Sequence, residues 1–170
     1  MRRWVAPAAA ALGIGFVAVL SMSGERDRSG LAAFESKGFL ARSPIGATAE
    51  VEMASPDRHR VFRRRGQTWQ GASAAEAALL DGALALTRDA APERNLTAAD
   101  IEGMGLATYG LARPALIVTI RTEGAPALRI AFGGANPLGL SRYAQVEGES
   151  GIWLVPGHLA RAWEDAMGGP

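Results

Sequence analysis

The chain has 170 residues, no cysteine, and 18 basic against 17 acidic side chains. That length fits one domain of ordinary size plus a short extra segment. The lack of cysteine excludes disulfides, thiolate metal sites and cysteine nucleophiles, and a net charge of +1 leaves no global field that would attract nucleic acid.

The N-terminus carries an uncharged apolar segment at residues 4–22, WVAPAAAALGIGFVAVLSM. As an α-helix, a segment of this length rises close to the ~30 Å thickness of a bilayer's hydrocarbon core. Arg2 and Arg3 precede it, and charges of both signs follow it. The positive-inside rule therefore predicts a cytoplasmic N-terminus, one membrane-spanning helix within residues 1–22, and an extracytoplasmic remainder attached to the cytoplasmic (inner) membrane.

A cleaved signal peptide is the alternative interpretation of this segment, because it too has a basic start and an apolar stretch. Residues 21–23 (SMS) make a poor cleavage site, and the apolar stretch is longer than the usual signal core. We therefore favour a retained single-pass anchor.

Small residues recur four apart on the predicted membrane helix, where Ala9 is spaced with Gly13 and Ala11 with Gly15. Such spacing lets a second helix approach closely, so these four residues are candidates for helix packing. Alanine-rich segments also produce the spacing by chance. Residues 23–44, which are polar and punctuated by Gly and Ser, are predicted to be a tether.

Residues 45–170 are predicted to form the extracytoplasmic domain. Residues 45–53 alternate in polarity, residues 55–57 (SPD) form a turn, and residues 59–65 return, which predicts a hairpin followed by a strand-like piece from Trp69. Ser73 and Glu76 form a capping box. The helix that it opens is expected to run to about Arg88 with an apolar stripe of Leu79, Leu80, Ala83, Leu84 and Leu86.

The second half of the domain is rich in predicted strands. Residues 89–115 are expected to be irregular, with a short capped turn at 97–100. Strands are predicted at 116–122, 127–132, 143–146 and 152–155, with a loop at 133–139 and a last amphipathic helix at 157–167. The order of hairpin, helix, meander and helix predicts an α+β fold with a mostly antiparallel sheet and two packed helices.

Several short elements of this domain match the pattern of a known family. They are RRGQTW at 64–69, the "YGL-x-x-P" element YGLARP at 109–114, IAFG at 130–133, YAQV at 143–146 and IWLV at 152–155. In their order they resemble the domain of unknown function 4340 family, over about residues 45–167. The resemblance implies an N-terminally anchored bacterial domain, often encoded beside ABC-type transport genes of the gliding-motility kind. The family has no assigned catalytic residues, so none is carried over.

No constellation of residues predicts catalysis or metal binding. His59 lies among arginines, which would oppose a cationic metal, and His158 has no second histidine at ligand spacing. Nucleophile-elbow and Ser-x-x-Lys motifs are missing. The glycine-rich stretch 133–139 lacks the following helix and the lysine of a phosphate-binding loop. We therefore expect no catalytic residue, no cofactor and no metal.

The most unusual local feature is the basic run RHRVFRRR at 58–65. On a strand, Arg60 and Arg64 share one face with Phe62, while Arg63 and Arg65 share the other. Arginines on both faces suggest an edge strand, and a solvated edge that resists aggregation is one interpretation. The other is that Arg60, Arg63, Arg64 and Arg65 contact lipid phosphates or an acidic partner.

Three functions remain open from the sequence. The favoured one is a non-catalytic accessory or scaffold subunit of a larger inner-membrane complex, either a transporter or an energy-converting assembly. Its partners would be integral membrane proteins and membrane lipid, with no nucleic acid. The second is a module that binds glycan or lipid on a sheet face near Trp69, Tyr143 and Trp153. Exposure of these aromatic side chains would favour the module, and burial would favour the scaffold. An enzyme, the third, would need polar groups that converge in a deep pocket.

Overall fold

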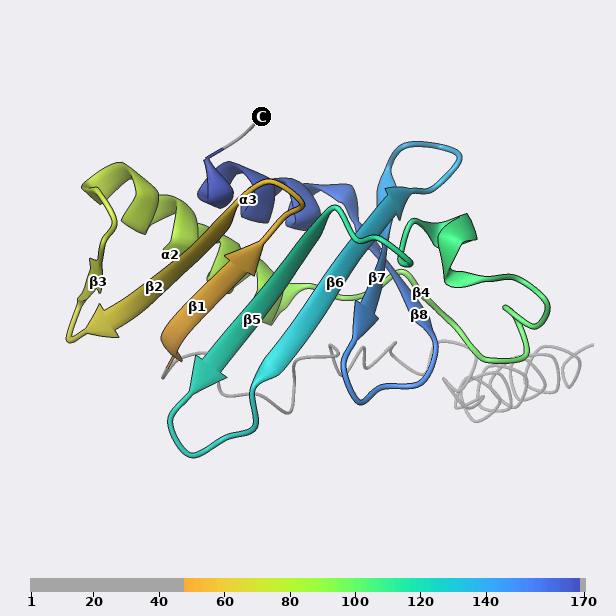
Figure 1. Ribbon diagram of the computed structural model, residues 1–170, viewed down its shortest axis with the longest axis horizontal. Helices are drawn as coiled ribbons and strands as arrows, with labels where there is room; N and C mark the ends of the chain where they lie inside the picture. The colour runs from red at the N-terminus through yellow and green to blue at the C-terminus, as the bar shows by residue number, and fades with distance from the viewer. Residues whose placement is uncertain (1–47, 169–170) are drawn as a thin grey trace, which may run out of the picture. The chain divides into compact units, whose positions relative to one another are not determined.

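The computed structural model describes residues 48–168, which form one antiparallel sheet with two α-helices (Figure 1). This confirms the predicted α+β class. The strands lie in the order β3-β2-β1-β5-β6-β7-β8-β4. In chain order the elements are β1 (Thr48–Ala54), β2 (His59–Arg65), β3 (Thr68–Gln70), α2 (Ala74–Asp89), β4 (Arg94–Leu96), η3 (Leu106–Tyr109), β5 (Leu116–Thr122), β6 (Leu128–Ala135), β7 (Ser141–Val146), β8 (Ile152–Pro156) and α3 (Gly157–Met167).

Both α-helices pack on the same face of the sheet, and the main core lies between the two layers (Figure 1). Alternate residues of the strands point into this core, as the period of two in an extended chain requires. The helices also contact each other through a buried polar link, in which Trp163 Nε1 donates to Thr87 Oγ1 at 2.9 Å. Thr87 Oγ1 in turn donates to the Ala83 carbonyl at 2.6 Å. The largest fully buried side chains are Trp163, Phe62, Phe132, Met53 and Leu80.

The predicted boundaries agree with the structure where turn and cap residues mark them. Residues 59–65, 116–122 and 157–167 form β2, β5 and α3 as expected. The capping box of α2 is also present, because Glu76 N donates to Ser73 Oγ and Ser73 N donates to Glu76 Oε2. The predicted turn at 97–100 is capped in the same way, with the Asp100 carboxylate accepting from the Thr97 backbone N–H.

Two predicted loop segments are wrong because they belong to the sheet. Gly133, Gly134 and Ala135 extend β6, and the loop begins only at Asn136. Residues 94–96, which fall in the stretch expected to be irregular, form β4 and pair with β8 at one edge of the sheet. Strands of three residues and strands that contain glycine lack the alternation on which the prediction rests.

The apolar stripe predicted for α2 is partly wrong. Leu80, Ala83 and Leu84 are buried, but Leu79 and Leu86 are 43% and 38% exposed. Thr87 completes the buried face instead. Because α2 is rich in leucine and alanine on several sides, its sequence does not determine which leucines point inward.

Gly82 lies in the middle of α2, and no atom lies within 4 Å of the position that a Cβ would take. We therefore expect Gly82→Ala to raise the free energy of unfolding by ~0.5–1 kcal/mol, because alanine has the higher helix propensity. Chemical denaturation measures the change. Gly66→Ala is the matched control, since Gly66 also faces open space but has φ +60°; this variant should lower stability. Destabilisation by Gly82→Ala would contradict the expectation.

A second, smaller apolar cluster lies on the face of the sheet opposite the helices. It contains Tyr109, Leu111 and Ile152, with Ala131 and Tyr143 packed beside them. The sheet residues in it alternate along their strands with residues of the main core, so they point to the other side. The segment between β4 and β5, which includes η3, therefore covers this face over β6, β7 and β8.

Glycines allow that segment to approach β6 closely. Gly110 has φ +69°, and a Cβ on it would lie 2.5 Å from the Gly134 backbone nitrogen. A Cβ on Gly133 would lie 2.3 Å from the Tyr109 carbonyl oxygen. The YGL element and the glycines that follow IAF are thus two sides of one backbone contact.

The described residues 48–168 include no helix long and apolar enough to cross a membrane. The predicted membrane helix with Ala9, Ala11, Gly13 and Gly15 lies outside the described residues, and so does the predicted tether 23–44. These assignments stay predictions.

Candidate functional site: an open, charged sheet face

The helix-free face of β1, β2 and β5, together with Arg129 near the start of β6, is not covered by the segment between β4 and β5. We call this surface the open face. The register places its side chains in rows across the strands, since Glu52 pairs with Val61 and Thr119, and Thr119 pairs with Arg129. The side chains of the open face are Glu50, Glu52, Ala54, His59, Val61, Arg63, Arg65, Ile117, Thr119, Arg121 and Arg129.

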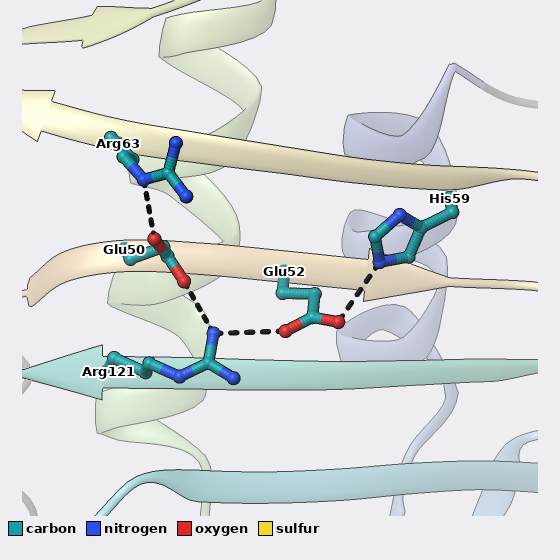
Figure 2. Close-up of polar contacts among 5 residues, drawn as sticks. All are labelled: Glu50, Glu52, His59, Arg63 and Arg121. Atoms are coloured by element: carbon teal, nitrogen blue, oxygen red, sulfur yellow. Dashed lines mark hydrogen bonds and ion pairs between the residues drawn. The ribbon is translucent and has the colours of Figure 1, made fainter.

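Five of these side chains form one network of hydrogen bonds and ion pairs across three strands (Figure 2). Arg121 Nη1 lies 2.5 Å from Glu50 Oε1 and 2.9 Å from Glu52 Oε2. Arg63 Nε donates to the other Glu50 oxygen at 2.7 Å, and His59 Nε2 lies 3.0 Å from Glu52 Oε1. One arginine on β5 therefore joins two glutamates on β1, and each glutamate has a second partner on β2.

The network holds the Glu52 carboxylate in the charged form. The hydrogen bond with His59, and then the one from Arg121, hold the pKa of Glu52 below its ordinary value. The pKa of Arg121 is raised, chiefly by its hydrogen bond to Glu52. Because the arginines remain largely exposed, the network contributes little to stability. Its charges are fixed in position and accessible to a partner.

Two adjoining hollows extend the open face toward β7. They measure about 480 Å³ and 260 Å³ and share Ile117, Arg129 and Glu147 in their linings. Pro114 and Leu111 border the larger hollow, and Arg121 borders the smaller. The open face thus combines a charged ladder with a depression whose lining mixes apolar side chains, such as Ile117 and Ala131, with charged ones, such as Arg129 and Glu147.

The four arginines predicted as contact residues divide between the two faces of β2. Arg63 and Arg65 point to the open face and are exposed. Arg60 and Arg64 point to the helix layer, where Arg60 Nη2 donates to Glu76 at 2.7 Å and Arg64 pairs with Asp81 of α2. Their guanidinium carbons also lie 4.6 Å from the ring centroids of Phe62 and Trp69.

The edge-strand prediction for β2 is wrong along its second half, because β3 pairs with Arg63, Arg64 and Arg65. Arginines are tolerated on the inward face because α2 supplies the carboxylates Glu76 and Asp81 at the border of the core. The helix-side arginines are therefore structural, whereas Arg63 and Arg65 are exposed on the other face of β2.

The Glu76 carboxylate, which accepts hydrogen bonds from the Ser73 backbone and from Arg60, makes stability depend on pH. The hydrogen bond from the Ser73 backbone, and then that from Arg60, lower the pKa of Glu76 from 4.5 to about 2. A carboxylate with a depressed folded-state pKa adds stability above its unfolded pKa and loses this contribution as the pH falls through the folded value. We expect the free energy of unfolding to fall between pH 4.5 and about 2, and to fall less in Glu76→Gln. Urea unfolding at several pH values measures this, with Glu123→Gln on an exposed turn as control. Equal pH slopes for all three proteins would contradict the assignment.

The three aromatic side chains whose exposure would favour a ligand-binding module are not exposed. Trp69 is buried, and its indole donates to Asp81 at 3.0 Å. Tyr143 and Trp153 are half-buried. Tyr143 packs edge-on against Tyr109 with ring centroids 5.0 Å apart, and Trp153 packs against the main core. These three rings therefore do not form an exposed binding surface.

Sequence reasoning missed the central residue of the open face, Arg121. Arg121 is the next-to-last residue of an otherwise mostly buried strand, and only the pairing of β1 with β5 places it between Glu50 and Glu52. None of these three residues belongs to a sequence motif that predicts a site. Within residues 48–168, no group of three or more histidine or acidic side chains could hold a metal ion.

Comparison with known proteins identifies the family alone. No curated protein and no solved structure matches the chain. The family model described as "Domain of unknown function (DUF4340)" matches residues 67–165, which is more than half of the chain and runs from the end of β2 almost to the end of α3. The match contains the YGL element and the glycines of β6 whose backbones meet. The chain therefore belongs to the DUF4340 family.

Proposed function

We propose that this protein is a non-catalytic accessory subunit of a larger inner-membrane complex, and that its open face contacts an integral membrane partner. In this proposal residues 4–22 are the retained anchor and the described domain lies on the extracytoplasmic side. The partner is a transporter or an energy-converting assembly; the resemblance noted above favours a transporter.

The observation that carries the proposal is the asymmetry of the sheet. Two helices cover one face, whereas no segment within residues 48–168 covers β1, β2 and β5 on the other face, which carries a ladder of paired charges (Figure 2). An antiparallel sheet can leave one face in water, so bareness alone is ordinary. Here the bare face adds preset charges of both signs beside a depression lined by both apolar and charged side chains, a mixture that suits a partly polar protein interface. The burial of Trp69 and the packing of Tyr143 and Trp153 count against a glycan- or lipid-binding surface at those rings.

The test is extraction of the full-length protein in a mild detergent, combined with site-directed crosslinking. Because the chain has no cysteine, Thr119→Cys on the open face can carry a maleimide photocrosslinker without background labelling. Arg161→Cys, exposed on α3, is the matched control on the helix layer. We expect a stoichiometric membrane protein to co-purify and to crosslink from residue 119 and not from residue 161. A monodisperse monomer at every detergent concentration would refute the proposal.

The arginines of β2 provide an independent prediction. Changing Arg63 and Arg65 to Ser should weaken the recovery of the partner about tenfold while the thermal unfolding temperature stays nearly constant, because both side chains are exposed. Arg60→Ser and Arg64→Ser should do the opposite, since these side chains bind α2. Quantitative pull-down and thermal denaturation of each variant measure the two effects. If the recovery of the partner is unchanged when Arg63 and Arg65 are replaced, these two arginines belong to a solvated surface and do not contact the partner.

A further inference from the structure

The loop between β6 and β7 exposes the two most accessible large apolar side chains of the described residues. Leu138 is 77% exposed and Leu140 is 73% exposed, whereas the next, Met104, is 48% exposed. Pro137 and Gly139 are exposed beside them, so residues 137–140 form an uncharged apolar tip. Single exposed leucines are common on proteins, but two on one short loop with no charge between them suggest a contact surface.

The loop has a fixed conformation. Asn136 Oδ1 accepts hydrogen bonds from the backbone N–H groups of Leu140 and Ser141 at 3.0 and 3.2 Å. Gly139, at φ +71°, donates to the Asn136 carbonyl at 2.8 Å, and the Leu140 carbonyl accepts from Gly157 N at 2.9 Å. The leucines are therefore presented by a built turn, and their burial would cost little ordering entropy.

We propose that this tip inserts Leu138 and Leu140 into the interfacial region of the bilayer that holds the protein. The inference rests on the anchor of the proposed function. Two leucines bury less apolar surface than one myristoyl chain, which gives only marginal membrane binding to a free protein. An anchor makes the contact intramolecular, so that even a weak insertion is well populated.

The chain outside the described residues is long enough for this contact. Thr48 pairs with Thr122 at the end of the sheet that carries the β5–β6 turn, and the β6–β7 loop lies at the opposite end. The two ends are separated by a strand of about eight residues, which spans roughly 26 Å. Between residue 22 and Thr48 there are 47 − 22 = 25 residues, which can extend to at most ~80–90 Å. The tip can therefore turn to the bilayer that anchors the chain.

The test uses the full-length protein in liposomes of phosphatidylcholine and phosphatidylglycerol at 3:1. Pro137→Cys carries an environment-sensitive fluorophore next to both leucines, and Glu123→Cys carries it on the polar turn at the opposite end of the sheet. We expect lipids with a spin label on the acyl chain to quench the probe at residue 137 at least fivefold more than the probe at 123. Leu138→Ser with Leu140→Ser should abolish that excess, and the single variant Leu138→Ser should halve it.

Equal quenching at the two positions, or quenching that survives the serine variants, would overturn the proposal. Flotation of the protein with the liposomes shows separately whether the anchor holds it in the bilayer. Protein that floats while its tip stays unquenched contradicts this inference alone, whereas protein that does not float contradicts the anchored subunit itself.

Discussion

Gly133→Ala should destabilise the domain by about 3 kcal/mol, the upper end of what overpacking costs. The added Cβ would lie 2.3 Å from the Tyr109 carbonyl oxygen and 3.0 Å from Leu111 Cγ. The first of these atoms is backbone, so it cannot move away by a change of rotamer. Relief would require the YGL segment to separate from β6, which would open the small cluster of Tyr109, Leu111 and Ile152. Chemical denaturation of the wild-type and variant proteins measures the loss.

Gly134→Ala is the matched control for this substitution. Its Cβ would lie 3.6 Å from the Tyr109 oxygen, which is ordinary van der Waals distance. We expect a loss below ~1 kcal/mol for this variant. Similar stability of the two variants would show that the close approach of the YGL segment does not constrain β6. The close approach joins two elements of the family pattern that begin 130 − 109 = 21 positions apart, since each provides one side of the same contact.

Leu80→Ala should cost ~2–5 kcal/mol, because Leu80 is fully buried between α2 and the sheet and its truncation leaves a cavity. Leu79→Ala removes the same atoms from the adjacent residue of the same helix. Since Leu79 is 43% exposed, we expect a loss of under ~1 kcal/mol. Urea denaturation of both variants gives the difference directly.

The pair also tests the orientation of α2. The sequence predicts both leucines to be in the core, whereas the structure rotates the helix so that Leu80 and Thr87 face inward. Equal losses of stability for Leu79→Ala and Leu80→Ala would mean that α2 buries both leucines, as the sequence predicts. The orientation of α2 in the structure would then be wrong.

Local chemistry predicted most of the fold. The hairpin, the Ser73–Glu76 capping box, the meander and the last helix are all encoded by alternation, turn residues or caps within a few positions of each other. The prediction failed where partners are distant in sequence. β4 is a strand only because β8 supplies its pairing, and Gly133 and Gly134 belong to β6 because the pairing with β7 resumes after them, at Ala135 and Arg142.

The same distinction explains the candidate site. Alternation placed Arg60 and Arg64 on one face of β2 and Arg63 and Arg65 on the other, as the structure has them. Which face was structural could not be predicted, because that depends on the carboxylates of α2. The charged network was missed because it requires the register of β1 against β5, which brings together residues about 70 positions apart.

The central claim is that an anchored domain lies on the outer side of the inner membrane. Ser150→Cys provides the most direct test, because it creates the only thiol of the chain in an exposed loop between β7 and β8. Intact spheroplasts are treated with a membrane-impermeant maleimide, and the mass of the labelled protein is measured in the membrane fraction. The proposal predicts labelling before lysis, on a species that still contains residues 1–22. Labelling only after lysis, or a labelled species that begins beyond residue 22, would contradict it.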